Sequence, residues 1–108
     1  MKLRVFLSHS PEMFEGYYGP RALAALAEHA EVTRNPGATV LSGAALAEAA
    51  RGCHAIVADR ATPGLPETFA AMPELLAFLR VAVDISTINV PAASAAGVLV
   101  TRATPGFV

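Results

Sequence analysis

Short apolar runs of strand length alternate along the chain with stretches in which apolar residues recur at helical spacing. The runs are rich in β-branched, leucine and aromatic residues, a composition that favours buried strands. We expect five such strands, at 3–7, 31–34, 54–59, within 75–85 and at 97–101. The second run is short, as an edge strand would be.

The stretches between these runs predict four helices. The first follows Pro20, whose fixed φ suits a first helical turn, and its apolar stripe is formed by Leu23, Leu26, Ala27 and Ala30. The second follows Ser42, a common N-cap residue type, and its stripe is formed by Leu46, Ala49, Ala50 and Cys53. The third, at 67–72, is stopped by Pro73. Asn89 can cap the fourth, which a glycine ends at position 97.

Five alternating strands and helices with short connections indicate an α/β protein with a parallel sheet covered on both faces. Because crossovers between parallel strands are right-handed, the simplest arrangement is a doubly wound sheet in the flavodoxin-like order 2-1-3-4-5. The loops after the carboxyl ends of the strands converge on the ligand crevice of such a sheet. We therefore look for chemistry in those loops.

One stretch resembles a known family. The segment Arg80-Val81-Ala82-Val83-Asp84-Ile85-Ser86-Thr87-Ile88-Asn89, followed by Gly97-Val98-Leu99-Val100 and Thr104-Pro105-Gly106, resembles the end of the N-terminal half of the D-2-hydroxyacid dehydrogenases, which include phosphoglycerate dehydrogenase. Ala82 and Asp84 stand where that family has glycines, and Ser86-Thr87 where it has Asp-Asn. The resemblance implies a substrate-binding domain over 1–103 and the start of an interdomain hinge at 104–108.

The resemblance also implies a site for the carboxylate of a small 2-hydroxy or 2-keto acid. The turn after the fourth strand would supply backbone amides from Ala82, Val83 and Asp84, and the loop after the third would contribute Arg60, Ala61 and Thr62. Amides in a tight turn bind anions without side-chain charge. The carboxylate of Asp84 would repel an anionic substrate, so either the ligand differs from a simple 2-keto acid or Asp84 caps the turn. Arg60 is either a ligand residue or a solvated loop residue.

No dinucleotide fingerprint is present. The glycines stand at 16, 19, 37, 43, 52, 64, 97 and 106, and nowhere form G-x-G-x-x-G after a strand. In the resembled family that motif belongs to a second, NAD-binding domain, which also carries the catalytic Arg, Glu and His. The resemblance thus implies a truncated chain with no catalytic, cofactor or metal residues of its own, which depends on NAD only in the longer parent enzyme and is inactive alone.

Two other interpretations are compatible with the residues. A flavodoxin-like binding or signalling module would share the fold, but the Ser8-His9-Ser10 segment lacks the acidic pair of a receiver domain, although Asp59 follows the third strand. A role in assembly alone, as a homo-oligomer, would follow if apolar surface were left bare. His9 and the pair Tyr17-Tyr18 could face a ligand or serve ordinary structural roles.

Composition narrows the class of partner. The net charge is -1 with 16% charged residues and no cluster of Lys or Arg, which argues against nucleic acid and anionic membranes as partners. No apolar run approaches the roughly 18 residues of a membrane span, and the N-terminus lacks a signal peptide, so we expect a cytoplasmic protein. Cys53, the only cysteine, allows no internal disulfide and no cysteine-based zinc site, and we expect it to be buried.

Overall fold

The structure is a computed structural model that describes residues 3–9, 20–35, 40–58, 62–80 and 87–101. The strands in these ranges are β1 (Leu3–Leu7), β2 (Ala30–Arg34), β3 (Ala55–Ala58), β4 (Ala77–Arg80) and β5 (Leu99–Thr101). The helices are α2 (Pro20–Ala27), α3 (Gly43–Ala49), α4 (Pro66–Ala70) and α5 (Val90–Ala95). Strands and helices alternate along the chain, as the sequence predicts.

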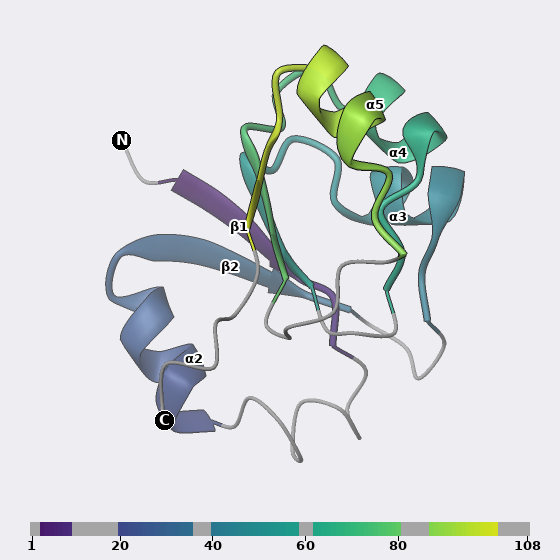
Figure 1. Cartoon of the computed structure of the whole chain (residues 1–108). Helices are drawn as coiled ribbons and strands as arrows, with labels where there is room; N and C mark the ends of the chain where they lie inside the picture. The colour runs from purple at the N-terminus through teal and green to yellow at the C-terminus, as the bar shows by residue number, and fades with distance from the viewer. Residues whose placement is uncertain (1–2, 10–19, 36–39, 59–61, 81–86, 102–108) are drawn as a thin grey trace, which may run out of the picture.

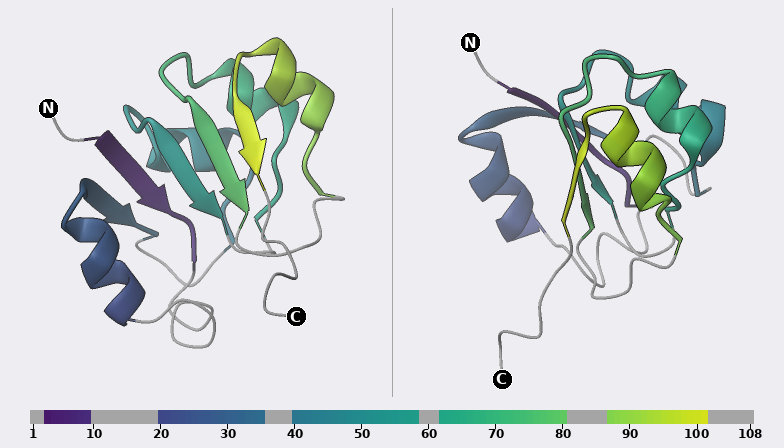
Figure 2. Two further views of the ribbon diagram at one scale, coloured as in Figure 1. Left: turned by 60° about the vertical axis from the view of Figure 1, so that its left-hand side comes forward. Right: turned by 45° about the horizontal axis from the view of Figure 1, so that its top comes forward.

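The strands form one parallel sheet in the order β2-β1-β3-β4-β5, which confirms the predicted fold class (Figure 1). One register runs across the sheet, pairing Phe6 with Ile56, Ile56 with Phe78, and Phe78 with Val100. β2 occupies an edge, as predicted, although its five residues make it as long as the interior strand β1. Figure 2 shows the strands side by side with their carboxyl ends at the same edge of the sheet.

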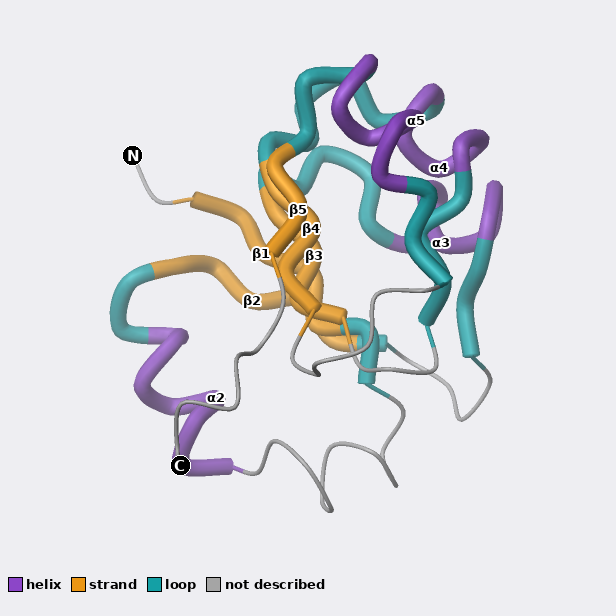
Figure 3. Tube along the Cα trace, in the orientation of Figure 1, coloured by secondary structure: helices purple, strands orange, loops and turns teal. Residues whose placement is uncertain are grey.

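One face of the sheet carries the larger hydrophobic core. Helices α3, α4 and α5 lie together on this side (Figure 3). Phe6, Ile56 and Phe78 point toward them from neighbouring strands and are fully buried. The ring of Phe69 in α4 meets that of Phe78 edge to face, with 5.8 Å between centroids and 79° between planes. Such aromatic contacts and the surrounding aliphatic side chains make this the main source of hydrophobic stabilisation.

The other face is covered by α2, which lies on the opposite side of the sheet from the other three helices (Figure 2). Leu23 and Leu26 pack against a smaller buried cluster of Val5, Leu7, Ala30 and Val57. The two leucines of the predicted stripe therefore face the sheet, whereas Ala27 is exposed and Ala30 is the first residue of β2, because the helix ends before it. Alternation along β1 explains the two cores, because Phe6 faces one and its neighbours face the other.

The helix ends confirm one predicted cap and modify another. The side chain of Asn89 accepts a hydrogen bond from the backbone N–H of Ala92 at 3.0 Å, as expected of an N-cap. Ser42 occupies the N-cap position of α3, but its side chain makes no capping hydrogen bond. Gly97 follows α5 with φ of 76°, a left-handed conformation that glycine adopts without strain.

Candidate functional site

Buried polar side chains gather at the carboxyl edge of the sheet. Among the described residues, the buried polar or charged ones are Ser8, His9, Asn35, Thr62, Thr68 and Arg80. All but Thr68, which lies in α4, directly follow or end a strand, or lie in the loop after β3. Buried polar groups cost free energy unless they are hydrogen-bonded. Their concentration at the carboxyl edge therefore makes this edge the candidate functional site.

Hydrogen bonds link the ends of β2, β1 and β3. The side-chain N–H of Asn35 donates to the carbonyl of Ser8 at 3.2 Å, and the backbone N–H of Asn35 donates to that of Leu7 at 3.0 Å. Ser8 in turn donates its backbone N–H to Val57 at 3.0 Å. The hydroxyls of Ser8 and Thr62 lie 2.9 Å apart, with both side chains buried. The loop after β3 is thus joined to the end of the neighbouring interior strand β1.

Arg80 continues this chain of contacts to β4. It is the last residue of β4 and only 2% exposed, and its side chain alternates onto the same face as Phe78. One terminal nitrogen, Nη2, donates to the carbonyl of Thr62 at 2.5 Å and to the hydroxyl of Thr87 at 3.1 Å. A buried guanidinium thus connects the loop after β3 with the loop after β4.

The same two loops are also paired through their backbones. Gly64 and Ile88 form a parallel bridge, in which Gly64 N–H donates to Thr87 O at 3.1 Å and Asn89 N–H donates to Gly64 O at 2.8 Å. A Cβ on Gly64 would lie 2.8 Å from Cγ2 of Ile88. Glycine is therefore required for the backbones to approach this closely.

The structure describes one of the six substrate-site residues predicted from the sequence. Thr62 lies fully buried at the carboxyl edge, where its carbonyl and hydroxyl meet Arg80 and Ser8. The other five lie outside the described residues, so their roles stay predictions: Arg60, Ala61, Ala82, Val83 and Asp84. Tyr17 and Tyr18 also lie outside them.

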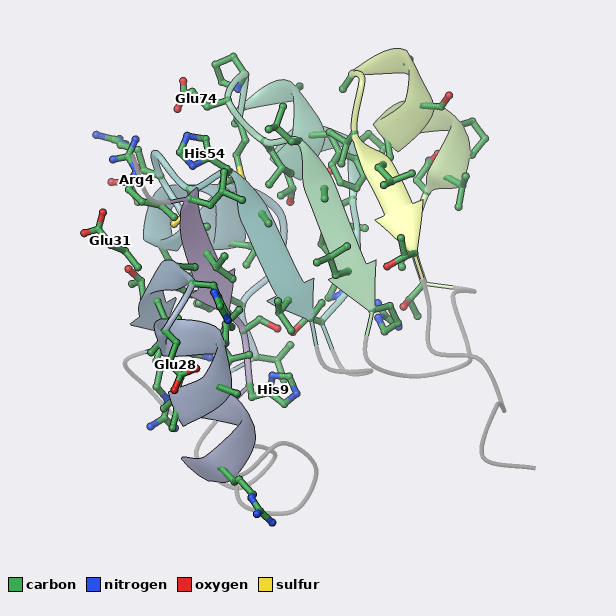
Figure 4. The ribbon with its side chains drawn as sticks, turned by 90° about the vertical axis from the view of Figure 1, so that its left-hand side faces the viewer. Arg4, His9, Glu28, Glu31, His54 and Glu74 are labelled. Carbon is green, nitrogen blue, oxygen red and sulfur yellow. The ribbon has the colours of Figure 1, made fainter. Side chains whose placement is uncertain are left out.

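The remaining candidate side chains, those of two histidines and the cysteine, are all at least partly buried. His9 is fully buried beyond the end of β1 (Figure 4), and contact with a ligand stays one of the two roles considered for it. His54 lies at the opposite edge, where its Nδ1 accepts the backbone N–H of Arg4 at 3.0 Å. Cys53 is buried, as expected, and burial raises the pKa of its thiol, an effect that nearby Arg4 partly opposes. Low thiolate content makes Cys53 a packing residue.

Sequence reasoning did not single out Arg80 or Ser8 as site residues. The available signal for Arg80 was a charged residue at the end of the otherwise apolar β4, Ala77-Phe78-Leu79-Arg80. A charged side chain in such a place is expected to be paired. For Ser8, the signal was its position directly after the apolar first strand.

The described ranges contain neither a cluster of metal-ligating side chains nor a helix that could span a membrane. No group of three or more His, Cys, Asp or Glu side chains there could hold a metal ion. None of the helices described has the length and apolarity required to cross a bilayer.

Comparison with known families identifies the class of protein to which this wound sheet belongs. Residues 13–107 match the model of the "D-isomer specific 2-hydroxyacid dehydrogenase, catalytic domain". The chain belongs to this family, and the resemblance found in the sequence is confirmed. None of the curated proteins matches the chain.

Solved structures share the fold. A protein from Polaromonas sp. JS6 66, assigned by its description to the NAD-binding D-isomer specific 2-hydroxyacid dehydrogenases, superposes with a TM-score of 0.81 at 21% identity, over 93% of this chain and 30% of that one. D-lactate dehydrogenase from Escherichia coli superposes with a TM-score of 0.70 at 18% identity, over 95% of this chain and 31% of that one. A glyoxylate reductase from Paecilomyes thermophila superposes with a TM-score of 0.73 at 16% identity, over 96% of this chain and 33% of that one. The chain spans about a third of the length of these proteins.

Proposed function

We propose that this chain is the substrate-binding part of an NAD-dependent D-2-hydroxyacid dehydrogenase, an enzyme that interconverts 2-keto and 2-hydroxy acids. Membership of the family over residues 13–107 supports the reaction class. The observation that carries the proposal is the pairing of the loops after β3 and β4 at the carboxyl edge of the sheet, through Arg80 and the Gly64–Ile88 bridge. A ligand of a wound parallel sheet binds at this edge.

The ligand we propose is a small carboxylate. Its carboxyl group would be held by the loop that contains Arg60, Ala61 and Thr62 and by the turn that contains Ala82, Val83 and Asp84. Thr62 is anchored beside the guanidinium of Arg80, whose positive charge favours an anion nearby. Desolvation at this buried edge strengthens that attraction.

The residues after β1 do not fit a dinucleotide. A pyrophosphate would need a glycine-rich turn there, leading into a helix N-terminus. Instead β1 is followed by Ser8 and His9, which are both buried, and the Ser8 hydroxyl is engaged with Thr62. The first glycine of the chain stands at position 16. These residues therefore do not fit NAD, and we propose that its site and the proton donor belong to another part of a longer protein.

Titration of the isotope-labelled chain, followed by amide chemical shifts, tests this function. Pyruvate at millimolar concentration should shift the amides of Thr62, Gly64, Thr87 and Ile88, whereas methyl pyruvate, which lacks the carboxylate, should leave them in place. NAD should shift no amide, and the chain should not oxidise NADH in the presence of pyruvate. Turnover by these 108 residues, or unmoved amides at saturating pyruvate, would contradict the proposal.

A further inference from the structure

Arg80 has features that packing alone does not require. Its side chain is charged, 2% exposed and placed at the end of a strand whose other residues are apolar. A buried ionic group and its partners, when all are replaced together by hydrophobic residues, commonly leave a protein just as stable, so packing does not require a charge at this position. The role of Arg80 must therefore be sought in its hydrogen-bond partners.

Arg80 contacts both of the loops to which the substrate site is assigned above. Nη2 donates to a main-chain oxygen, Thr62 O, and to a side-chain hydroxyl, Thr87 Oγ1. Thr62 and Thr87 are 25 residues apart in the chain and belong to different βα connections. A planar guanidinium with several donors can make two such bonds at once, whereas a lysine ammonium holds its partners less rigidly.

The position of Thr62 depends on contacts from two sides. Its hydroxyl meets Ser8 at 2.9 Å, which ties it to the end of β1, and its carbonyl meets Arg80, which ties it to the end of β4. Gly64, two residues on, is bridged to Ile88. Arg80 therefore holds the loop after β3 at a set distance from the loop after β4.

We propose that Arg80 is a positioning residue of the substrate site, which acts through Thr62 and Thr87 to hold the two carboxylate-binding loops in register. This inference rests on the proposed function and deepens it. Binding sites require their groups to be held within a fraction of an ångström by surrounding hydrogen bonds. Loss of the Arg80 contacts should therefore weaken ligand binding even where the fold survives.

The test compares pyruvate affinity in four variants by amide shift titration. Arg80→Lys keeps the charge but loses the paired geometry, and it should weaken binding roughly tenfold, the equivalent of about one charged hydrogen bond. Thr87→Val removes one of the two contacts and should weaken binding about threefold to tenfold. Gly64→Ala leaves Arg80 in place but forces Ile88 away, and it should weaken binding to a similar extent. Ile56→Val, in the buried β3, lowers stability and should leave affinity unchanged.

Hydrogen exchange at the amides of Gly64 and Asn89, both of which donate across the bridge, provides a readout that does not depend on ligand. Exchange at these amides should speed up in Arg80→Lys and Thr87→Val more than in Ile56→Val. If Arg80→Lys fails to fold, Thr87→Val alone decides the matter.

The outcomes separate the two proposals. Wild-type affinity in Arg80→Lys or, if that variant fails to fold, in Thr87→Val would overturn the positioning role, because charge or bulk alone would then suffice, and the proposed function would stand. A wild-type chain that binds no pyruvate would remove the proposed function and this inference with it. Weakened affinity in Ile56→Val equal to that in Thr87→Val would reduce Arg80 to a stability residue.

Discussion

Polar side chains at the amino ends of the strands, the amino edge of the sheet, are more exposed than those at the carboxyl ends, the carboxyl edge. At the amino edge, Arg4 and Glu74 are exposed and His54 is half-buried (Figure 4). At the carboxyl edge, Ser8, Thr62 and Arg80 are each no more than 2% exposed. Polar groups in water cost the fold little, whereas buried ones must be paired. The comparison therefore locates the candidate site at the carboxyl edge, where polar groups are buried despite their desolvation.

The contacts at the two edges also join different kinds of segment. At the amino edge, Arg4 donates its backbone N–H to His54 in an exposed setting. At the carboxyl edge, Arg80 joins two loops that lead into α4 and α5. At the amino edge the contact therefore joins the ends of neighbouring strands, whereas at the carboxyl edge it sets the relative position of the loops after β3 and β4.

The largest difference should appear when each arginine is replaced by methionine. Arg80→Met leaves the Thr62 carbonyl buried without its cationic donor and should lower the free energy of unfolding by about 2–4 kcal/mol. Arg4→Met retains the backbone bond to His54 and should change it by no more than about 0.5 kcal/mol. Urea unfolding followed by circular dichroism measures both. Equal losses would show that burial does not distinguish the edges.

A smaller effect is expected for the hydroxyl pair within the carboxyl edge. Ser8→Ala and Thr62→Val should each cost about 1–2 kcal/mol, because each leaves a buried hydroxyl without the partner it has at 2.9 Å. The double variant should show a coupling energy of about 1 kcal/mol in a thermodynamic cycle. Thr33→Val, on the exposed side of the edge strand β2, is the matched control, with a change within about 0.5 kcal/mol. Additive losses would mean that the two hydroxyls do not interact.

The smallest effect concerns Cys53, which is buried near the amino edge. Burial raises the pKa of its thiol above the ordinary value of 9.0, against the opposing influence of Arg4. As pH rises past 9.0, the unfolded chain loses this proton while the folded chain keeps it. The stability contribution of the neutral thiol is therefore complete below pH 9.0 and falls as pH rises toward the raised pKa.

Comparison with Cys53→Ala isolates this contribution from other groups that titrate in alkali. The wild type should lose more stability than Cys53→Ala between neutral pH and the alkaline range. The folded wild type should also react slowly with iodoacetamide at neutral pH, since the thiolate is the reactive form. Parallel pH profiles for the two proteins, or rapid labelling of the native state, would contradict the raised pKa.

The architecture could be read from local patterns. The apolar runs predicted five strands, and their alternation with helices predicted the order 2-1-3-4-5. Leu23 and Leu26 in α2 and the cap at Asn89 were also evident from spacing and residue type. The strands, the helices and the cap depend on residues a few positions apart, so the sequence carries them directly. The strand order followed from the general right-handedness of parallel crossovers. The strand within 75–85 was the least well bounded, because its apolar run continues beyond Arg80, where the described part of β4 ends.

The site depended on contacts between distant parts of the chain. Membership of a family and the convergence of loops at the carboxyl edge followed from the sequence, as did Thr62 as a candidate. The meeting of Ser8 with Thr62, 54 residues away, and of Arg80 with Thr62 and Thr87 followed only from the tertiary structure. Strand register and the close approach at Gly64 decide which buried polar groups face one another. Sequence periodicity sets the face on which a side chain lies, but only packing sets its partner.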